Sequence, residues 1–268
     1  MEGSQPLTWA SGGITNQRRP RSEEVTEVRK MKHIVFFSGG KASFGAAYRL
    51  RESTDEPITL LFTDTKVEDA DLYRFLIQSA ALIPNSELVS LADGRTIWEV
   101  FDDNSFLGNH RVPICSRVLK NEVAVKWVKA NCNPDDTTLY FGIDYTEAHR
   151  TEGVSKRWEP YTVDYPLLWK PLWDKHQNVD AILAEKRVEQ PRLYRAGNER
   201  NNCGGGCIRA GQGHFTRLYK SPDMRPVFME WEAQENKLRE RLGNVSILDD
   251  RRDGERKPLP LSVLRAEI

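Results

Sequence analysis

The chain contains little cysteine, has no charge excess and lacks a long apolar run. Only four of its 268 residues are cysteine, too few and too unevenly spaced for a disulfide framework, so we expect reduced thiols that are available to a metal. Lys and Arg total 39, as do Asp and Glu, so the overall charge favours neither nucleic acid nor an anionic membrane. No segment is apolar enough to span a bilayer, and the N-terminus carries Arg18, Arg19 and Arg21 instead of a signal peptide's apolar core. These absences predict a cytoplasmic protein without a membrane partner.

The order of apolar and polar segments predicts one main domain with a smaller appendage. Residues 1–30 are rich in Gly, Ser, Pro, Arg and Glu and are expected to form a flexible arm. Over 31–170, strands expected at 34–37, 58–64, 87–91 and 138–143 alternate with helical patterns, the longest at 115–130. This alternation predicts an α/β fold, a Rossmann-like, doubly wound, mostly parallel sheet of about five strands with helices on both faces. Residues 171–245 are expected to form a helical, cysteine-bearing C-terminal part, and 246–268 a solvated tail.

The most informative segment is the loop between the first strand and the first helix, Ser38-Gly39-Gly40-Lys41-Ala42-Ser43. A glycine turn at this position lets the backbone approach a ligand, exposes several N–H groups and adds the positive end of the helix dipole. We therefore predict an anion site that binds phosphate. A tight connection with no ligand is the alternative, since neither a dinucleotide fingerprint nor a Walker loop is present.

Polar residues also follow the second and fourth strands. Ligands of parallel α/β sheets bind outside the carboxyl ends of the strands, near a switch in strand order. We therefore expect Asp64 and Thr65, and beyond the fourth strand Gly142 and Glu147, to face the same crevice as the loop. The Asp64 carboxylate is expected to accept ribose hydroxyls or to hold Mg²⁺, unless it caps the following helix.

Several cations could neutralise phosphate in this crevice. Lys41 and Arg150 are the first candidates, Arg by a bidentate fork and Lys as a point charge, and together with Asp64 they form the predicted catalytic set. Arg117 and Lys120 lie three residues apart on one helix face and predict a second anion patch. Solvated positions would explain Lys41 and Lys120 as well.

The second strong motif is Cys203-Gly-Gly-Gly-Cys207. Three glycines let two thiolates turn toward one centre, and Cys115 would supply a third ligand. A structural Zn²⁺ site would need a fourth ligand from His214 or His110. A [4Fe-4S] cluster held by three cysteines would leave one iron open to a sulfide or a substrate atom. Unmetallated thiols on a plain loop are the third alternative.

Taken in order, these motifs resemble the phosphoadenosine-phosphosulfate reductase-like branch of the PP-loop ATP pyrophosphatase (adenine nucleotide alpha hydrolase) superfamily. The loop is similar to that superfamily's S-G-G-x-D-S, with Ala42 where Asp is usual. Further similar segments follow at 61–68, 115–120, 147–150, 165–167, 191–194 and 201–207. The resemblance implies that the loop binds ATP with Mg²⁺ and that ATP is cleaved between its α and β phosphates. It also favours a cluster over zinc at the cysteines.

Three functions remain open on this basis. The first is an ATP pyrophosphatase-type enzyme that adenylates an acceptor, a nucleic acid or a small molecule, for sulfur transfer from a sulfur-donor protein. The second is a reductase-like enzyme that acts on a sulfonucleotide with an external thiol-reductant protein, because no cysteine follows Cys207 to serve as a tail thiol. The third is a nucleotide-binding protein without chemistry, for which Ala42 is the reason.

Overall fold

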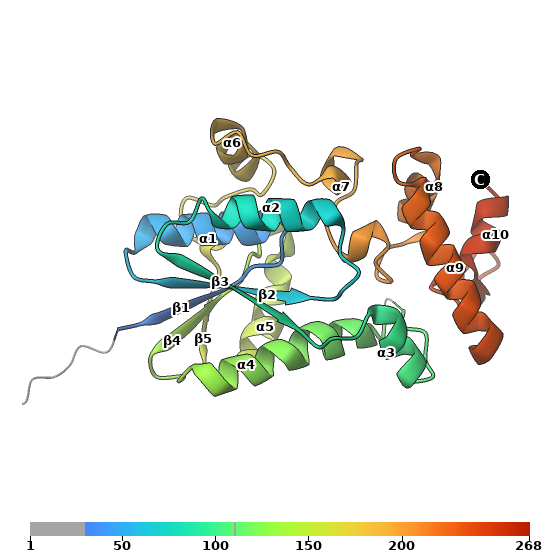
Figure 1. The fold of residues 1–268 in the computed structure, drawn as a ribbon, viewed down its shortest axis with the longest axis horizontal. Coiled ribbons are helices and arrows are strands. Elements are labelled where there is room, and N and C mark those ends of the chain that lie inside the picture. The colour runs from blue at the N-terminus through green and yellow to red at the C-terminus, as the bar shows by residue number, and fades with distance from the viewer. Residues whose placement is uncertain (1–29, 110) are drawn as a thin grey trace, which may run out of the picture.

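The computed structural model describes residues 30–109 and 111–268, and it confirms the predicted α/β fold (Figure 1). Five parallel strands form one sheet in the order β3-β2-β1-β4-β5. The predicted arm, apart from residue 30, and His110 lie outside the described residues. The strands are β1 (Lys32–Phe36), β2 (Ile58–Asp64), β3 (Ser86–Ala92), β4 (Thr137–Tyr140) and β5 (Thr162–Asp164).

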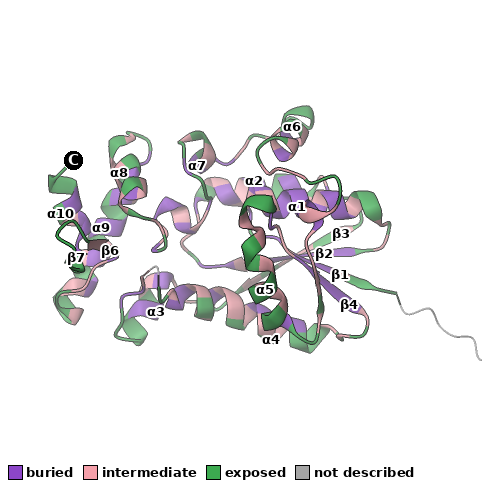
Figure 2. Cartoon of the chain, turned by 180° about the vertical axis from the view of Figure 1, so that it is seen from behind, coloured by how far each residue is buried: buried purple, intermediate pink, exposed green. Residues whose placement is uncertain are grey.

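Helices cover both faces of the sheet, as Figures 1 and 2 show. On one face, α1 (Lys41–Ser53), α2 (Ala70–Ala80) and α6 (Asn178–Glu185) bury Phe44, Phe75 and Val179 in a common core. On the other face, α4 (Val123–Asn131) and α5 (Thr151–Trp158) contribute Val128 and Trp158. The helix predicted over 115–130 begins as a π-helix, η1 (Ser116–Glu122), and continues as α4. The sheet is therefore doubly wound.

The strand order reverses between β1 and β4, so the segments that follow these two strands meet at one edge of the sheet. Gly142 shows how closely they approach. A Cβ atom at Gly142 would lie 2.4 Å from the carbonyl oxygen of Ala42 and 2.6 Å from the amide nitrogen of Ser43. Only a residue without a side chain fits between the two segments.

The C-terminal residues form a second core beside the sheet, and the prediction of a solvated tail is wrong. Leu261 and Leu264 are buried, and the carboxylate of the buried Glu235 accepts the backbone N–H groups of Ile247 at 2.7 Å and of Leu261 at 2.6 Å. The charged run over 249–257 conceals this packing in the sequence because the apolar residues lie on either side of it. The elements are α8 (Gln212–Lys220), α9 (Arg225–Leu242), β6 (Leu248–Asp250), β7 (Lys257–Leu259) and α10 (Leu261–Ala266).

The division expected at residue 170 does not separate two independent units. Helix α6 lies beyond that point but packs on α1, where a Cβ atom at Gly45 would lie 2.5 Å from Val179. Helix α3 (Ile97–Asp103) lies before it but contributes Ile97 and Phe101 to the C-terminal core. In the described ranges, no helix combines the length and apolarity needed to cross a membrane. The remaining short elements are η2 (Tyr145–Arg150), η3 (Pro166–Leu168), α7 (Arg192–Arg195) and η4 (Cys203–Gly205).

Candidate functional site

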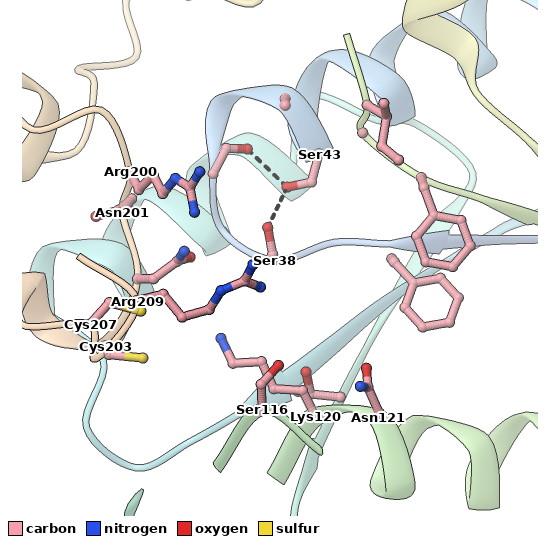
Figure 3. Close-up of a pocket in the computed structure, with 18 of the residues that line it drawn as sticks. Ser38, Ser43, Ser116, Lys120, Asn121, Arg200, Asn201, Cys203, Cys207 and Arg209 are labelled. Carbon is pink, nitrogen blue, oxygen red and sulfur yellow. Dashed lines mark hydrogen bonds between the residues drawn. The ribbon is translucent and has the colours of Figure 1, made fainter. Parts of the chain in front are cut away.

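A pocket of about 550 Å³ opens at the edge of the sheet where β1 and β4 end (Figure 3). Its walls come from the loop before α1, the segment after β4, the start of η1 and the cysteine-bearing loop that includes η4. This volume suits a small-molecule ligand. Of the residues predicted from the sequence, those that line it are Ser38, Gly40, Ser43, Thr65, Cys115, Lys120, Gly142, Glu147, Arg150, Cys203 and Cys207.

The loop between β1 and α1, residues 38–43, presents backbone and hydroxyl groups to the pocket. Gly39 adopts φ +73°, a conformation that favours glycine, and its carbonyl accepts an N–H from the Asn201 side chain at 2.9 Å. The Ser43 hydroxyl donates to the Gly40 carbonyl at 2.9 Å, and the Ser38 hydroxyl lies 3.3 Å from that of Ser43. Helix α1 begins directly after the glycines. This arrangement is a cradle for an anion at a helix N-terminus.

Lys41 does not line the pocket, contrary to its predicted role in binding phosphate. Its ammonium group lies 3.0 Å from the Asp180 carboxylate, 3.1 Å from Nδ1 of His176 and 4.8 Å from the centre of the Tyr194 ring. Only 3% of the residue is exposed. The side chain projects from the start of α1 toward α6, so its charge is neutralised by Asp180 outside the pocket.

Asp64 is also engaged within the protein and does not line the pocket. Its carboxylate accepts the Tyr73 hydroxyl and the backbone N–H of Lys66, both at 2.8 Å. Burial and this bond to Asp64 raise the pKa of Tyr73. The Asp64 carboxylate is therefore directed at Tyr73 and the backbone of Lys66, while its predicted contact with ribose or Mg²⁺ stays a prediction. The alternative role as a helix cap is wrong, because α2 is capped by Asp69, whose side chain accepts the N–H of Asp71.

Glu68 is the acidic residue that joins three residues of the pocket wall, although it does not itself line the pocket. Its buried carboxylate accepts the Cys203 N–H at 2.5 Å, the Thr65 hydroxyl at 2.9 Å and the Lys120 ammonium at 3.2 Å. It therefore ties together three segments that are distant in sequence. Sequence reasoning did not assign it to the site, although an acid that follows a buried strand is a signal that could have found it.

Lys120 is the member of the predicted Arg117–Lys120 patch that reaches the pocket. Burial opposes its charge, but the charge and hydrogen bond of Glu68, together with Cys203 and Cys207, outweigh this effect and hold the Lys120 pKa above its usual range. Arg117 instead points to solvent, where it lies 3.4 Å from Glu122. The expected second anion patch therefore reduces to one lysine.

Four further cations that no motif indicated also line the pocket: Lys175, which lies 3.4 Å from the Asp144 carboxylate, and the three arginines Arg157, Arg200 and Arg209. Figure 3 shows Arg200 and Arg209 reaching from the cysteine-bearing loop toward Ser38. Within the part of the chain that the structure describes, none of the three forms an ion pair, whereas Arg150 pairs with Glu147 at 2.5 Å. The pocket is therefore positive although the whole chain is neutral.

The loop over residues 201–209, called here the thiol loop, owes its shape to its glycines. Gly204 has φ +62°, and a Cβ atom on it would lie 2.8 Å from the Val67 carbonyl. A Cβ atom on Gly206 would lie 2.1 Å from the Trp231 ring. This crowding excludes any side chain at these positions and places the sulfur atoms of Cys203 and Cys207 side by side at the pocket (Figure 3).

The two thiols of this loop differ in acidity. The Cys203 S–H donates to the Cys207 sulfur, which lowers the pKa of Cys207 to about 6 and raises that of Cys203. Lys120 and Arg200 favour the Cys207 thiolate further. Cys115 faces the same pocket, but burial raises its pKa to about 11. Cys207 therefore loses its proton most readily of these thiols, which makes it the strongest nucleophile among these sulfur atoms.

The predicted metal ligands do not fit a metal ion as they are placed. Over residues 30–109 and 111–268, no three His, Cys, Asp or Glu side chains are grouped closely enough to hold one. Cys203 is hydrogen-bonded to the Cys207 sulfur, and Nε2 of His214 is hydrogen-bonded to the Gly205 carbonyl. Burial also lowers the pKa of His214. The donor set therefore forms neither a closed Zn²⁺ site nor a three-cysteine cluster site.

The sheet and the pocket define an α/β protein with an anion site at its topological switch point. No family model and no curated protein matches the chain. Its fold is similar to the crystal structure of phosphoadenylyl-sulfate (PAPS) reductase from Candida auris in complex with phosphate, with a TM-score of 0.44 and 16% sequence identity. The similarity covers 65% of this chain and 83% of that one. Similarity at this level does not indicate a shared activity.

Proposed function

We propose that the protein is an enzyme that binds a sulfonucleotide and cleaves the bond between its α-phosphate and its sulfo group. The observation that carries this proposal is that thiols and unpaired arginines line the same pocket as the anion-binding loop. A nucleotide joined to sulfate is an anion that needs such a cradle, and its sulfur atom is an electrophile for a thiolate. Release of sulfite and the nucleotide phosphate would follow.

The catalysis would be mainly positional and electrostatic. The N–H groups of the loop before α1 and the helix dipole would hold the α-phosphate, and Arg200 and Arg209 would neutralise the sulfo group. The Cys207 thiolate lies in the same pocket and would act as the nucleophile. In other enzymes, removing one such preorganised donor costs about 10²-fold or more in rate.

Cleavage of ATP between its α and β phosphates, which would adenylate a nucleic acid or a small molecule for sulfur transfer, is the second candidate. The anion-binding loop favours it, since the same cradle could hold the departing pyrophosphate. It ranks second because Lys41 and Asp64, the groups expected to assist with charge and Mg²⁺, are both engaged elsewhere.

The test is to incubate the protein with adenosine 5′-phosphosulfate, its 3′-phosphorylated form, or ATP with Mg²⁺, each with dithiothreitol. Sulfite is expected from one of the sulfonucleotides. Pyrophosphate and AMP from ATP, without sulfite from either sulfonucleotide, would overturn the first candidate in favour of the second. Tight binding without any product would indicate a nucleotide-binding protein without chemistry.

A further inference from the structure

The thiol loop is built so that its two sulfur atoms meet. The Gly206 N–H donates to the Cys203 carbonyl at 3.1 Å, and the Gly205 N–H donates to the Asn202 carbonyl at 3.0 Å, which closes a tight turn between the cysteines. Cys203 itself has φ +50°, unusual for a residue with a side chain. Its backbone N–H is held by Glu68 at 2.5 Å. Strain of this kind is commonly retained where the local geometry serves a function.

We propose that Cys203 and Cys207 form a reversible dithiol–disulfide couple that supplies two electrons within the pocket. A disulfide needs its two Cα atoms about 4.4–6.8 Å apart and its Cβ atoms directed toward each other. A closed turn with both side chains on its pocket side provides this arrangement, and the two sulfur atoms already share a hydrogen bond. The couple would supply the second attacking thiol from within the pocket, so that an external dithiol is needed only afterwards, to reduce the disulfide.

The other thiols are set apart from this pair. Cys115 precedes η1 on a different wall of the pocket and is buried. Cys132 packs against the core on the α4 face of the sheet and does not line the pocket. The couple is therefore specific to the two ends of the glycine turn.

With a sulfonucleotide as substrate, the couple would act in two steps. The Cys207 sulfur attacks the sulfo sulfur atom, and the bond to the bridging oxygen breaks with its electron pair remaining on the nucleotide phosphate. Cys203 loses its proton to solvent and attacks the Cys207 sulfur, so that a disulfide forms and sulfite leaves with the other electron pair. Two thiols are oxidised to one disulfide while sulfur is reduced from the sulfate to the sulfite level, and an external dithiol reopens the disulfide. This placement in the reaction rests on the proposed function, but the couple itself does not.

The couple can be tested without any nucleotide. Reduced full-length protein is equilibrated anaerobically in buffers of increasing glutathione disulfide, alkylated with N-ethylmaleimide and digested with trypsin. Cleavage after Arg200 and Arg209 releases the peptide over 201–209, which contains both cysteines and no other. We expect this peptide to shift from the doubly alkylated form to an unalkylated form that is two hydrogen atoms lighter than the free dithiol peptide. Reduction with dithiothreitol before alkylation should restore the doubly alkylated form.

The Cys115→Ser and Cys132→Ser variants should show the same shift, whereas Cys203→Ser should instead form a glutathione adduct at Cys207. Circular dichroism shows whether each variant is folded. Double alkylation of the 201–209 peptide at every ratio would overturn the couple, as would a disulfide from either cysteine to Cys115. Stoichiometric iron or zinc in the purified protein that protects both thiols would also overturn it. A working couple in a protein that releases no sulfite would refute the proposed function alone.

Discussion

Two glycine-rich loops face each other across the pocket, and they are built on different principles. In the loop over 38–43, glycines free the backbone so that its N–H groups and the start of α1 point at a ligand. In the thiol loop, glycines shape the turn and also remove bulk, because Gly206 lies against the Trp231 ring where no Cβ atom fits. The first loop presents main-chain dipoles, and the second presents two sulfur atoms.

A shared glycine-rich composition therefore does not imply a shared role for the side chains of the two loops. The lysine inside the first loop is tethered to Asp180 outside the pocket, while Lys120, from a helix distant in sequence, supplies a charge between the loops. Glu68 secures the thiol loop through a main-chain N–H, just as Asn201 secures the first loop through a carbonyl. Each loop is thus held by a side chain from elsewhere in the fold.

The largest effect is expected from breaking the support of the thiol loop with Glu68→Gln. This variant leaves Lys120 without its buried counter-charge and weakens the bond to the Cys203 N–H, so unfolding free energy should fall by about 2 kcal/mol. This loss of unfolding free energy is smaller than the loss expected for a fully buried ion pair, because 28% of the Lys120 side chain is exposed. Urea unfolding measures the loss. Glu122→Gln, which removes only the exposed partner of Arg117, is the control and should cost less than about 0.5 kcal/mol. Equal losses would contradict the role of Glu68.

Gly142→Ala should displace the loop over residues 38–43. The new Cβ atom would lie 2.4 Å from the Ala42 carbonyl, so the loop must shift and its amides lose their alignment. Affinity for adenosine 5′-phosphosulfate, measured by isothermal titration calorimetry, should fall by about tenfold, which corresponds to about 1.4 kcal/mol. Gly153→Ala in α5, where no atom lies within 4 Å of the new Cβ, should bind like the wild type. Unchanged affinity in both variants would show that the loop does not bind the nucleotide.

The roles of Lys41 and Lys120 can be distinguished by replacing each lysine with methionine. Lys120→Met should weaken binding of adenosine 5′-phosphosulfate by about fivefold, because it removes a cation that lines the pocket. Lys41→Met should change this affinity by less than about twofold but should lower the free energy of unfolding by about 1 kcal/mol, since the tether to Asp180 is lost. The reverse order of affinities would show that Lys41 turns into the pocket when the ligand binds.

The smallest effect concerns the acidity of the thiol loop. Because the pKa of Cys207 is lowered to about 6, its alkylation by iodoacetamide should accelerate as pH rises through that value, where the reactive thiolate forms. Cys203→Ala removes the S–H donor and should move the midpoint to higher pH. Mass spectrometry of the 201–209 peptide follows the rate. An identical midpoint in both proteins would show that Cys203 does not stabilise the thiolate.

The sequence allowed the sheet, its winding and the position of the pocket to be predicted, because these depend on local periodicity and on glycines beside strand ends. The directions of the Lys41 and Asp64 side chains were not predicted, since they depend on partners such as Asp180 and Tyr73 that lie far along the chain or on another element. The tail was misjudged because Glu235, which binds its amides, is one acid among many in a charged helix.

The unpaired arginines of the pocket have a consequence for how the molecule meets its ligand. Equal numbers of acidic and basic residues give the protein no net charge, so that its net charge does not favour binding to an ion-exchange matrix. At about 0.1 M salt, however, charges are screened beyond roughly 10 Å, so an approaching anion senses only the cluster around Arg157, Arg200 and Arg209. Capture of the ligand should therefore slow with ionic strength as it does for a basic protein, while the isoelectric point gives no sign of it.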